Sequence, residues 1–277
     1  MEKNFNIGIV GLGYVGKAIL YGFASENIYT FDTSKTSTEN SLEDLSDKAD
    51  MIFICVPTPM RKDGSCSVDI VKQVIESFNS FNKKHEVIIK STIPPGTCSY
   101  FKDKYSKLNI IFNPEFLTEA NPYQDFINQD RIILGGNNFS MVESLYEKHF
   151  PQTEIVKLNY SEAEMVKYFS NNFLALKVSF ANEIHSLCDK LNIDYGEVVK
   201  AATMDKRIGA SHLSVPGPDG KKGFGGTCFP KDLSALLSIF EDNDIKSPIL
   251  KAVWERNKNI DRIEADWTLL KGRAVIE

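Results

Sequence analysis

The chain has 277 residues, of which 42% are hydrophobic and 25% charged, and its formal net charge is −5. These values are ordinary for a globular protein and leave room for two domains and a sizeable core. Lys and Arg form no basic stripe, which argues against nucleic acid as the main partner, and no apolar run approaches the length of a membrane span.

The start of the chain and its cysteines indicate a compartment. Residues 1–6 lead straight into a strand-like run and show no secretory signal. No CxxC pair and no zinc-like spacing occurs among the cysteines, which are Cys55, Cys66, Cys98, Cys188 and Cys228. The four histidines lie singly, so we expect no metal. Free thiols without an export signal indicate the reducing cytoplasm.

The N-terminal part has the pattern of a dinucleotide-binding unit. A β-rich run, Phe5 to Val10, enters a glycine-rich hexapeptide: Gly11, Leu12, Gly13, Tyr14, Val15 and Gly16. A helical stretch, 17–24, follows, and a second strand, 28–31, ends in Asp32. Glycines between a strand and a helix, with an acid at the end of the next strand, are the context that the dinucleotide fingerprint requires.

Each fingerprint residue has an expected task. Gly11 makes the tight turn, Gly13 lets the backbone approach a pyrophosphate, and Gly16 lets helix and strand pack closely. The helix N-terminus stabilises the phosphate charge. Asp32 should bind the adenosine ribose and repel a 2′-phosphate, so NAD is preferred over NADP. The alternative is a tight βα turn without a ligand.

Strands alternate with helices through the rest of this half, which predicts an α/β fold with a parallel, doubly wound, Rossmann-like sheet. The expected segments are strands at 51–56, 86–90 and 108–112 and a helix at 68–81. Polar, proline-containing segments lie at the strand ends, at 56–59, 90–96 and 113–119. Ligands of such sheets bind off the carboxyl ends of the strands. Any one segment fits an ordinary turn, but three together favour a shared site.

A helix of about 30 residues is expected from Glu162 to Leu191, with Ser161 as its N-cap. Apolar residues recur in it at helical spacing, at Met165, Phe169, Phe173, Leu176 and Phe180. Such a helix would join two domains and offer a surface for dimerisation. We therefore expect a Rossmann-like domain at 1–159, and at 160–277 the bridging helix with an all-helical second domain.

Lys167 and Asn171 lie four residues apart, on one face of this helix. Most lysines are solvated, and spacing alone favours that interpretation for both residues.

The most distinctive run is Gly225-Gly226-Thr227-Cys228-Phe229-Pro230-Lys231-Asp232. Pro230 suits the first turn of a helix, and the following residues continue as one. A cysteine at a helix N-terminus feels the positive end of the dipole, and Lys231 is nearby, so both favour the thiolate. The alternative is a small buried cysteine beside a Gly-rich turn.

Together these motifs resemble the UDP-glucose 6-dehydrogenase family, within the UDP-glucose/GDP-mannose dehydrogenases. The resemblance runs in order along nearly the whole chain. It rests on the glycine fingerprint, 56–59, Ser91-Thr92, 113–117, 167–175, 205–209 and 223–232.

The resemblance implies an NAD-dependent four-electron oxidation of UDP-glucose to UDP-glucuronate. The Cys228 thiolate would add to the C6 aldehyde to give a thiohemiacetal, and a second oxidation would leave a thioester for water to hydrolyse. Lys167 and Asn171 could stabilise the developing oxyanion. Protons and the hydrolytic water would be handled by Asp232, Thr92 and Glu119.

The resemblance also implies binding residues. Arg207 would reach the substrate of a neighbouring subunit, which implies a homodimer. NAD would be held by the fingerprint residues together with Asp32, Lys35, Val56, Pro57, Thr58, Ser91, Thr92 and Glu119. The nucleotide sugar would be held by Glu115, Phe116, Leu117, Glu119, Lys167, Asn171, Arg207, Phe224, Gly225 and Gly226.

One departure from the family concerns the C-terminus. Residues 271–277 resemble the first strand of the family's usual third domain, the UDP-binding domain, which we expect to be absent. Three other functions stay open: a dehydrogenase of a UDP-N-acetylhexosamine or GDP-mannose, a β-hydroxyacid dehydrogenase, and a non-catalytic NAD-binding dimeric module.

Overall fold

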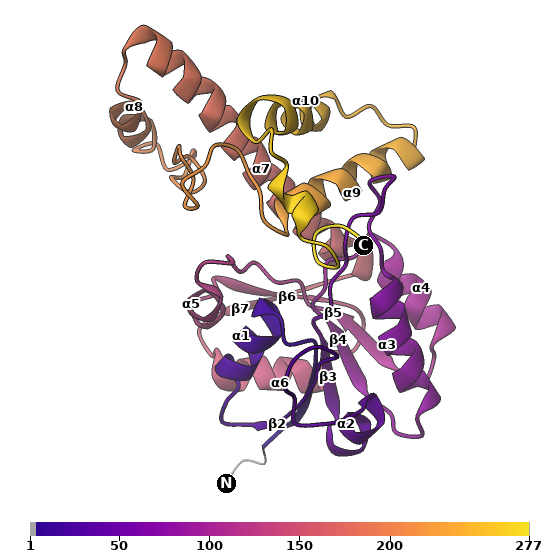
Figure 1. Ribbon diagram of the computed structural model, residues 1–277. Helices are drawn as coiled ribbons and strands as arrows, with labels where there is room; N and C mark the ends of the chain where they lie inside the picture. The colour runs from indigo at the N-terminus through magenta and orange to yellow at the C-terminus, as the bar shows by residue number, and fades with distance from the viewer. Residues whose placement is uncertain (1–3, 277) are drawn as a thin grey trace. The chain divides into compact units, whose positions relative to one another are not determined.

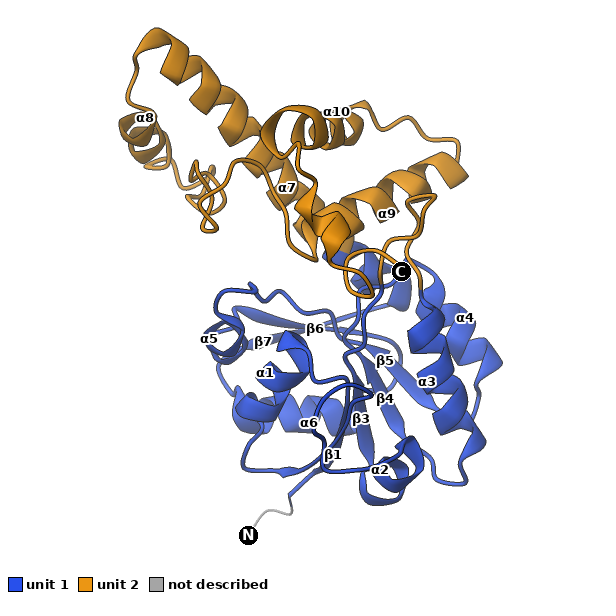
Figure 2. Cartoon of the chain, viewed as in Figure 1, with its two compact units in different colours: residues 1–58, 68–167 blue, residues 59–67, 168–277 orange. Residues whose placement is uncertain are grey.

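The structure, a computed structural model, describes residues 4–276 and divides into two compact units (Figures 1 and 2). The first unit comprises the described residues up to Thr58 together with Val68–Lys167. The second comprises Pro59–Ser67 and the described residues from Tyr168 onward. The division falls inside the long helix, whereas the sequence placed a boundary before it. The second unit also takes in a short segment from the N-terminal half.

The first unit is built on a seven-stranded sheet with the order β2-β1-β3-β4-β5-β6-β7. The strands are β1 Asn6–Val10, β2 Asn27–Phe31, β3 Met51–Ile54, β4 Glu86–Ile89, β5 Asn109–Phe112, β6 Arg131–Gly135 and β7 Glu154–Leu158. All neighbours are parallel except β5 and β6, which meet antiparallel at Phe112 and Gly135. The predicted parallel sheet is confirmed, and β6 and β7 extend it beyond the five strands expected.

Helices cover both faces of this sheet (Figure 1). They are α1 Tyr14–Gly22, α2 Leu42–Lys48, α3 Asp69–Ser80, α4 Thr97–Lys104, α5 Pro122–Ile127 and α6 Ser140–His149. Successive residues of β3 point to opposite faces, because Ile52 and Ile54 lie in one apolar core with α2, α3 and α4. Met51 and Phe53 lie in the other core, with α1, α5 and α6. The sheet is therefore doubly wound, as predicted.

The long helix, α7, runs from Tyr160 to Leu191. Its start is fixed by Asn159, whose Oδ1 accepts from the backbone N–H of Glu162 at 2.9 Å. The Glu162 carboxylate in turn accepts from the N–H of Asn159 at 3.0 Å, which completes a reciprocal capping box. The prediction that Ser161 caps this helix was wrong, since Asn159 already binds the free N–H of the first turn.

The second unit is helical, as predicted. Beside its part of α7 it contains α8 Tyr195–Ala202, α9 Phe229–Asp242, α10 Pro248–Arg256, a π-helical turn at Asn257–Asp261 and a 3-10 turn at Asp266–Leu269. The apolar core between α7, α9 and α10 contains Ala175, Phe224, Leu233, Leu237 and Val253. In the described part of this unit, β pairing is limited to isolated bridges.

Three segments far apart in the sequence meet in the second unit. The backbone N–H of Met60 donates to the Ala274 carbonyl at 2.8 Å, and the N–H of Ile276 donates to the Met60 carbonyl at 3.0 Å. The Ser234 hydroxyl of α9 donates to the Gly64 carbonyl at 3.0 Å. The tail that the sequence likened to the start of a further domain thus pairs, through residues 274–276, with Met60.

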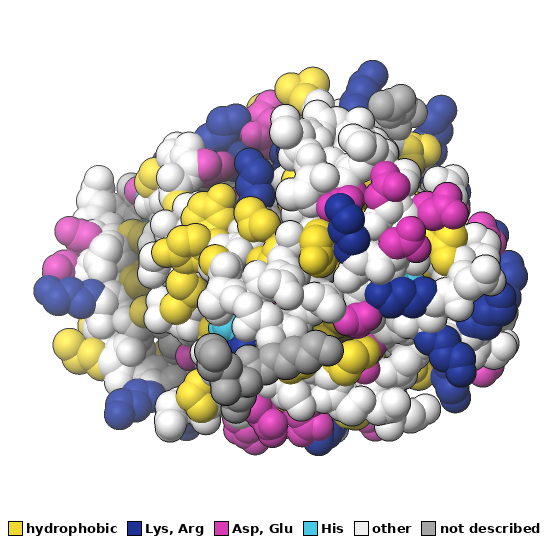
Figure 3. Space-filling view, turned by 90° about the horizontal axis from the view of Figure 1, so that it is seen from below, with side chains coloured by type: hydrophobic (Ala, Val, Ile, Leu, Met, Phe, Trp, Pro, Cys, Tyr) yellow, Lys and Arg dark blue, Asp and Glu magenta, His cyan; other side chains and the backbone are white. Residues whose placement is uncertain are grey.

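Two further observations concern the surface charge and the length and polarity of the helices. On the face drawn in Figure 3, acidic and basic side chains are interspersed. Between residues 4 and 276, every helix is too short or too polar to cross a bilayer.

Candidate active site

The glycine-rich turn of the first unit has the shape that the fingerprint predicts. Gly11 has a φ of +94°, and a Cβ there would lie 2.7 Å from the Cys55 carbonyl oxygen. A Cβ on Gly16 would collide with the Gly11 carbonyl oxygen. Around Gly13, the N-cap of α1, a Cβ would meet nothing within 4 Å. Two glycines are therefore required by packing, and the third leaves open space at a helix N-terminus, which fits an approaching pyrophosphate.

Asp32 lies beside this turn, just after β2. Its carboxylate accepts from the backbone N–H of Leu12 at 2.6 Å and from the N–H of Ser34 at 2.8 Å. Burial would raise the pKa of Asp32, but these hydrogen bonds and the nearby Lys35 hold it below its ordinary value. The Lys35 ammonium donates to the Leu12 carbonyl at 2.8 Å. The turn is therefore contacted at Leu12 both by an ionised carboxylate and by a cation.

The other predicted NAD residues of the first unit also follow its parallel strands. Val56, Pro57 and Thr58 come after β3, and Ser91 and Thr92 come after β4, so both groups lie at the carboxyl ends of neighbouring strands. The Ser91 hydroxyl donates to the Val56 carbonyl at 2.7 Å, which ties the two segments together. The remaining predicted NAD residues of this unit are Tyr14 and Val15 in the first turn of α1, and the exposed Glu119 in the loop after β5.

Lys167 and Glu115 form a buried ion pair in the first unit. The Lys167 side chain is 3% exposed, and its ammonium donates to the Glu115 carboxylate at 2.9 Å and to the Glu115 carbonyl at 2.6 Å. The second carboxylate oxygen accepts from the N–H of Leu117 at 2.7 Å. Burial would raise the pKa of Glu115, but Lys167, this N–H and Lys90 hold it below its ordinary value.

Beside this pair lies a cavity of about 250 Å³. Its lining includes Lys90, the loop 114–118 and the segment 128–131 that leads into β6. The Phe116 ring lies under two cations, with the Arg131 guanidinium 4.5 Å and the Lys167 ammonium 5.4 Å from its centroid. Glu115 and Phe116 thus contact Lys167, and Glu115, Phe116 and Leu117 all line the cavity.

Cys228 is the N-cap of α9 in the second unit, with Pro230 in the first turn as predicted. The N–H of Asp232 donates to the Cys228 carbonyl at 3.0 Å, which closes that turn. Cys228 is partly exposed, and its sulfur lies 3.7 Å from the Thr227 hydroxyl. A partly exposed cysteine at a helix N-terminus is the setting that favours reactivity over simple packing.

The Asp232 carboxylate contacts two polar side chains. Its carboxylate accepts from the Asn171 amide at 2.6 Å and forms an ion pair with Lys231. The pKa of Lys231 is lowered by burial, but Asp232, Cys228 and Cys66 bring it above its ordinary value overall. Lys231 and Asp232 lie in the first turn of α9, which follows Cys228, and Asn171 of α7 joins Asp232 there.

The interpretation of Lys167 and Asn171 as solvated residues was wrong, because they are only 2% and 6% exposed. Each finds its partner far along the chain, Lys167 at Glu115 and Asn171 at Asp232, and spacing within one helix cannot show this.

The segment before Cys228 is held from the C-terminal side. The Asn257 side chain accepts from the N–H of Phe224 at 2.8 Å and donates to the Phe224 carbonyl at 2.9 Å. A Cβ on Gly225 would lie 2.5 Å from the buried Arg262 guanidinium. Gly226, the last of the predicted substrate residues here, has a φ of +71°. The segment 224–226 is thus tightly fixed against side chains that the sequence did not single out.

Arg207 does not join the other candidate residues of the second unit. Its side chain is 90% exposed, and its guanidinium is paired with Asp205 at 2.6 Å. Sequence reasoning also missed the buried charges Lys90 and Arg262 and the role of Asn257. One signal for Lys90 was its position directly after the apolar run Val87–Ile89 and directly before Ser91-Thr92.

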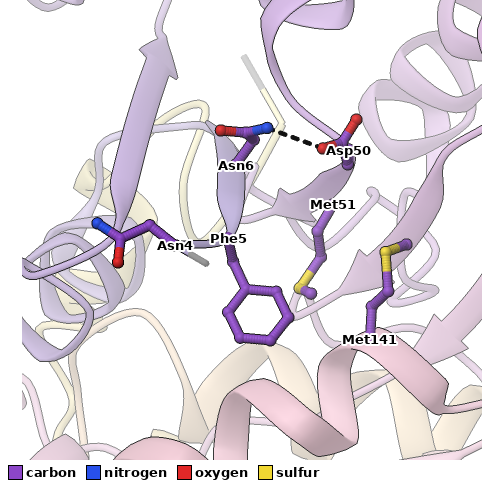
Figure 4. A pocket seen from close by; sticks show the side chains of 6 residues that line it. All are labelled: Asn4, Phe5, Asn6, Asp50, Met51 and Met141. Carbon is purple, nitrogen blue, oxygen red and sulfur yellow. Dashed lines mark hydrogen bonds between the residues drawn. The ribbon is translucent and has the colours of Figure 1, made fainter. Parts of the chain in front are cut away.

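A second cavity, of about 200 Å³, lies at the amino ends of β1 and β3 (Figure 4). It is lined by Asn4, Phe5, Asn6, Asp50, Met51 and Met141, and Asn6 donates to Asp50 at 2.9 Å across it. Asn6 and Met51 begin their strands, whereas ligands of such sheets bind at the opposite ends. Across the described residues, no cluster of three or more His, Cys, Asp and Glu is suited to a metal ion.

Comparison with known proteins gives consistent matches. Residues 30–150 match the model for the UDP-glucose/GDP-mannose dehydrogenase family, NAD binding domain, and residues 161–259 match that for the same family's central domain. The UDP-glucose 6-dehydrogenase of Rickettsia bellii is 40% identical over 78% of this chain and 50% of its own length. That of Rickettsia conorii is 35% identical over 96% of this chain and 70% of its own length.

Among solved structures, a UDP-glucose dehydrogenase from the hyperthermophilic archaeon Pyrobaculum islandicum superposes with a TM-score of 0.81 at 29% identity. The match covers 92% of this chain and 68% of the archaeal chain. The chain thus spans between half and about seven tenths of the length of these relatives.

Proposed function

The chain belongs to the UDP-glucose/GDP-mannose dehydrogenase family, and we propose that it oxidises UDP-glucose to UDP-glucuronate with NAD. The observation that carries the proposal is the setting of Cys228. A partly exposed cysteine at the start of α9, with Asp232 and its Asn171 and Lys231 partners in the following turn, supplies a nucleophile and a polar group in one turn of helix.

NAD is the cofactor we propose for this reaction. Open space at Gly13 beside the N-terminus of α1 would hold the pyrophosphate, and the ionised Asp32 would hold the adenosine ribose. When bound, NAD accepts a hydride from the sugar C6 at each of the two oxidations. The residues after β3 and β4 would line the rest of its site, namely Val56, Pro57, Thr58, Ser91 and Thr92.

The chemistry of the protein's own groups follows from their types. An aldehyde gives up a second hydride readily only after a nucleophile has made its carbon tetrahedral. The Cys228 thiolate would form that C–S bond and give a thiohemiacetal, whose oxygen carries developing negative charge. The buried ammonium of Lys167 and the amide of Asn171 would stabilise this oxygen by charge and by hydrogen bonding.

The second oxidation leaves a thioester on Cys228. Water attacks its carbonyl carbon, the C–S bond breaks, and the thiolate leaves while the sugar becomes a uronic acid. Asp232, which ends α9's first turn, would accept the proton of the attacking water, with Thr92 and Glu119 as further proton-handling groups. Glu115 would hold the Lys167 ammonium in place, and Phe116, Leu117 and 224–226 would line the sugar site.

We also propose a homodimer that forms through α7. Phe169, Phe173 and Phe180 of this helix are 69%, 53% and 60% exposed, and Leu187 and Leu191 continue the row at helical spacing. The exposed Arg207 would reach the substrate of the partner subunit. The free thiols support a cytoplasmic location, and the expected domains, 1–159 and 160–277, remain part of the proposal.

Stoichiometry tests the proposed function. The chain is incubated with UDP-glucose and NAD, and NADH and uronic acid are both measured. Two NADH per uronic acid are expected, because both oxidations occur before release. Cys228→Ser should abolish uronic acid formation, since the hydroxyl is a far weaker nucleophile at neutral pH. Production of one NADH per sugar with no need for Cys228 would indicate a simple alcohol dehydrogenase instead.

Two further measurements separate the alternatives. If the protein turns over GDP-mannose or a UDP-N-acetylhexosamine in preference to UDP-glucose, the proposed substrate is wrong and the proposed mechanism is retained. Calorimetric titration with NAD tests cofactor binding by itself, and no heat at millimolar NAD would contradict it. Binding of NAD without any NADH formation would favour a non-catalytic module.

A further inference from the structure

Lys90 is a buried cation with an unusual set of partners. It follows β4 directly and is 3% exposed, and it lines the 250 Å³ cavity beside the loop 114–118. Its ammonium donates to a neutral group, the Asn113 side-chain oxygen, at 2.9 Å. An ammonium that lies so deep normally has a carboxylate in direct contact. Its position therefore calls for a reason other than a simple ion pair.

Asn113 is the first residue of the loop that carries Glu115. Its oxygen accepts from Lys90 and also from the Tyr146 hydroxyl of α6, the latter at 2.6 Å. Its amide donates to the Ile133 carbonyl of β6 at 2.8 Å. Lys90 thus anchors the start of the loop, two residues before the carboxylate that holds Lys167.

The charges around Lys90 come from three neighbouring elements. Glu115 attracts its charged form and Lys167 opposes it. Burial raises the pKa of the Cys55 thiol, after β3, to about 12 and raises that of the Tyr146 hydroxyl, so both are uncharged near neutral pH. Near neutral pH the charged members of this group are therefore two cations and one carboxylate between them.

We infer that Lys90 is a positioning residue: through Asn113 it fixes the loop 113–117, and through its charge it keeps Glu115 ionised so that Glu115 holds Lys167 in place. The two effects act on the same ion pair. One sets where the Glu115 carboxylate lies, and the other sets whether it carries the charge that Lys167 requires. The consequence for catalysis rests on the proposed function, since it is there that Lys167 acts on the substrate oxygen.

A purely structural Lys90 would behave differently. If Lys90 only anchored the loop through Asn113, removal of its charge would leave the titration of Glu115 unchanged. A positioning Lys90 must instead move the titration of Glu115 when its charge is removed. A comparison of the pH dependence with and without the Lys90 charge therefore distinguishes a positioning role from a structural one.

The direct test needs neither substrate nor cofactor. In protein labelled with ¹³C-lysine, the Lys90 Cε signal is identified by its loss in Lys90→Arg. Burial lowers the pKa of Lys90 to about 8, with Glu115 opposing this shift, so Lys90 should titrate well below solvated lysines, whose values lie near about 10.4. In Glu115→Gln the midpoint should fall by about one pH unit, because the attracting charge is gone and Lys167 still repels. An unchanged midpoint in that variant would overturn the inference.

The kinetic test uses Lys90→Met and Lys90→Arg. In Lys90→Met the Glu115 pKa should rise, so kcat should be lost on the acid side at a higher pH, with kcat near neutral pH lowered about tenfold. Lys90→Arg keeps the charge and should restore most of the profile, and KM for NAD should change little in either variant. Lys102→Met removes a charge from the exposed face of α4 and serves as the matched control.

A lowered kcat with an unshifted pH profile would mean a structural role and would contradict the inference. If the wild-type chain forms no NADH from UDP-glucose, the proposed function fails, and the lysine titration still decides whether Lys90 and Glu115 are coupled.

Discussion

Asn171 and Asp232 lie 61 residues apart in the chain and are joined by a hydrogen bond of 2.6 Å from the amide nitrogen to a carboxylate oxygen. Lys231 forms an ion pair with the same carboxylate, so Asp232 receives a donor from each side. All three side chains are well buried, which makes this group energetically sensitive as well as chemically useful.

Asp232→Asn should destabilise the protein. The substitution leaves the Lys231 ammonium without its carboxylate, and breaking a buried pair at one partner costs about 3 kcal/mol in the free energy of unfolding. Urea unfolding measures this cost. The double variant Lys231→Met/Asp232→Leu should recover part of it, because no uncompensated charge remains.

The exposed pair of Lys200 and Glu197 on α8 provides the control. Lys200→Met should cost less than about 0.5 kcal/mol. Equal losses in the free energy of unfolding for the exposed and the buried pair would show that burial of the Asp232 pair makes it no more sensitive to substitution than a surface pair.

Asp32→Asn should weaken the preference for NAD over NADP. The amide can still accept from the N–H of Leu12, so the turn is kept, but the charge that repels a 2′-phosphate is lost. We expect the ratio of the two dissociation constants, measured by calorimetry, to fall about tenfold. Asp50→Asn, at the amino end of β3, should leave the ratio as it is. An unaltered ratio in Asp32→Asn would argue against a ribose contact.

Phe173→Asp should convert the proposed dimer to a monomer. Phe169 and Phe173 stack with ring centroids 6.2 Å apart on the exposed row of α7, and a carboxylate there cannot be buried against a partner. Light scattering after gel filtration gives the mass. Leu269→Asp, at an even more exposed apolar residue outside α7, should keep the dimer. A wild-type chain that is already monomeric would contradict the proposal.

The free energy of unfolding should fall in acid because the Glu26 carboxylate becomes protonated. Its fully buried carboxylate accepts from the N–H of Phe5 at 2.7 Å and contacts Lys148 at 2.6 Å and His149 at 2.7 Å. Burial would raise the pKa of Glu26, but these partners hold it below its ordinary value. The unfolded chain therefore takes up this proton first, and the stabilisation is lost as the pH falls from about 4.5 through the folded-state pKa.

Unfolding free energies measured between about pH 6 and pH 3 should show this loss, and Glu26→Gln should make the curve flatter. Glu147→Gln, at an exposed residue of α6 next to Lys148, should leave the curve unchanged. A wild-type curve no steeper than that of Glu26→Gln would refute the assignment.

The sequence predicted those parts of the fold that depend on local patterns. Gly11, Gly13 and Gly16 have local requirements of backbone shape, and strands that alternate with helices dictate a parallel sheet. Pro230 at the first turn of α9 was likewise readable from its neighbours.

Long-range partners set the rest. Lys167 resembled a surface lysine because its carboxylate lies 52 residues away, at Glu115. Asn257 and Arg262, which hold the segment before Cys228, lie 33 and 40 residues from the groups they contact there. Ser161 was chosen as a cap because it is a good cap type, but Asn159 forms a reciprocal pair with Glu162 that a single residue cannot match.

The segment 59–67 has a consequence for how this protein is made and divided. This segment is synthesised long before the residues that it contacts. Gly64 is hydrogen-bonded to Ser234, which comes 170 residues later, and Met60 is hydrogen-bonded to Ala274. The second unit can therefore form these contacts only after the residues up to Ala274 have left the ribosome, which makes its completion a late event of high contact order. No single cut yields that unit intact, because a C-terminal fragment from Tyr168 onward would lack one of its own pieces (Figure 2). Addition of a peptide spanning 59–67 to such a fragment should therefore increase its resistance to proteolysis.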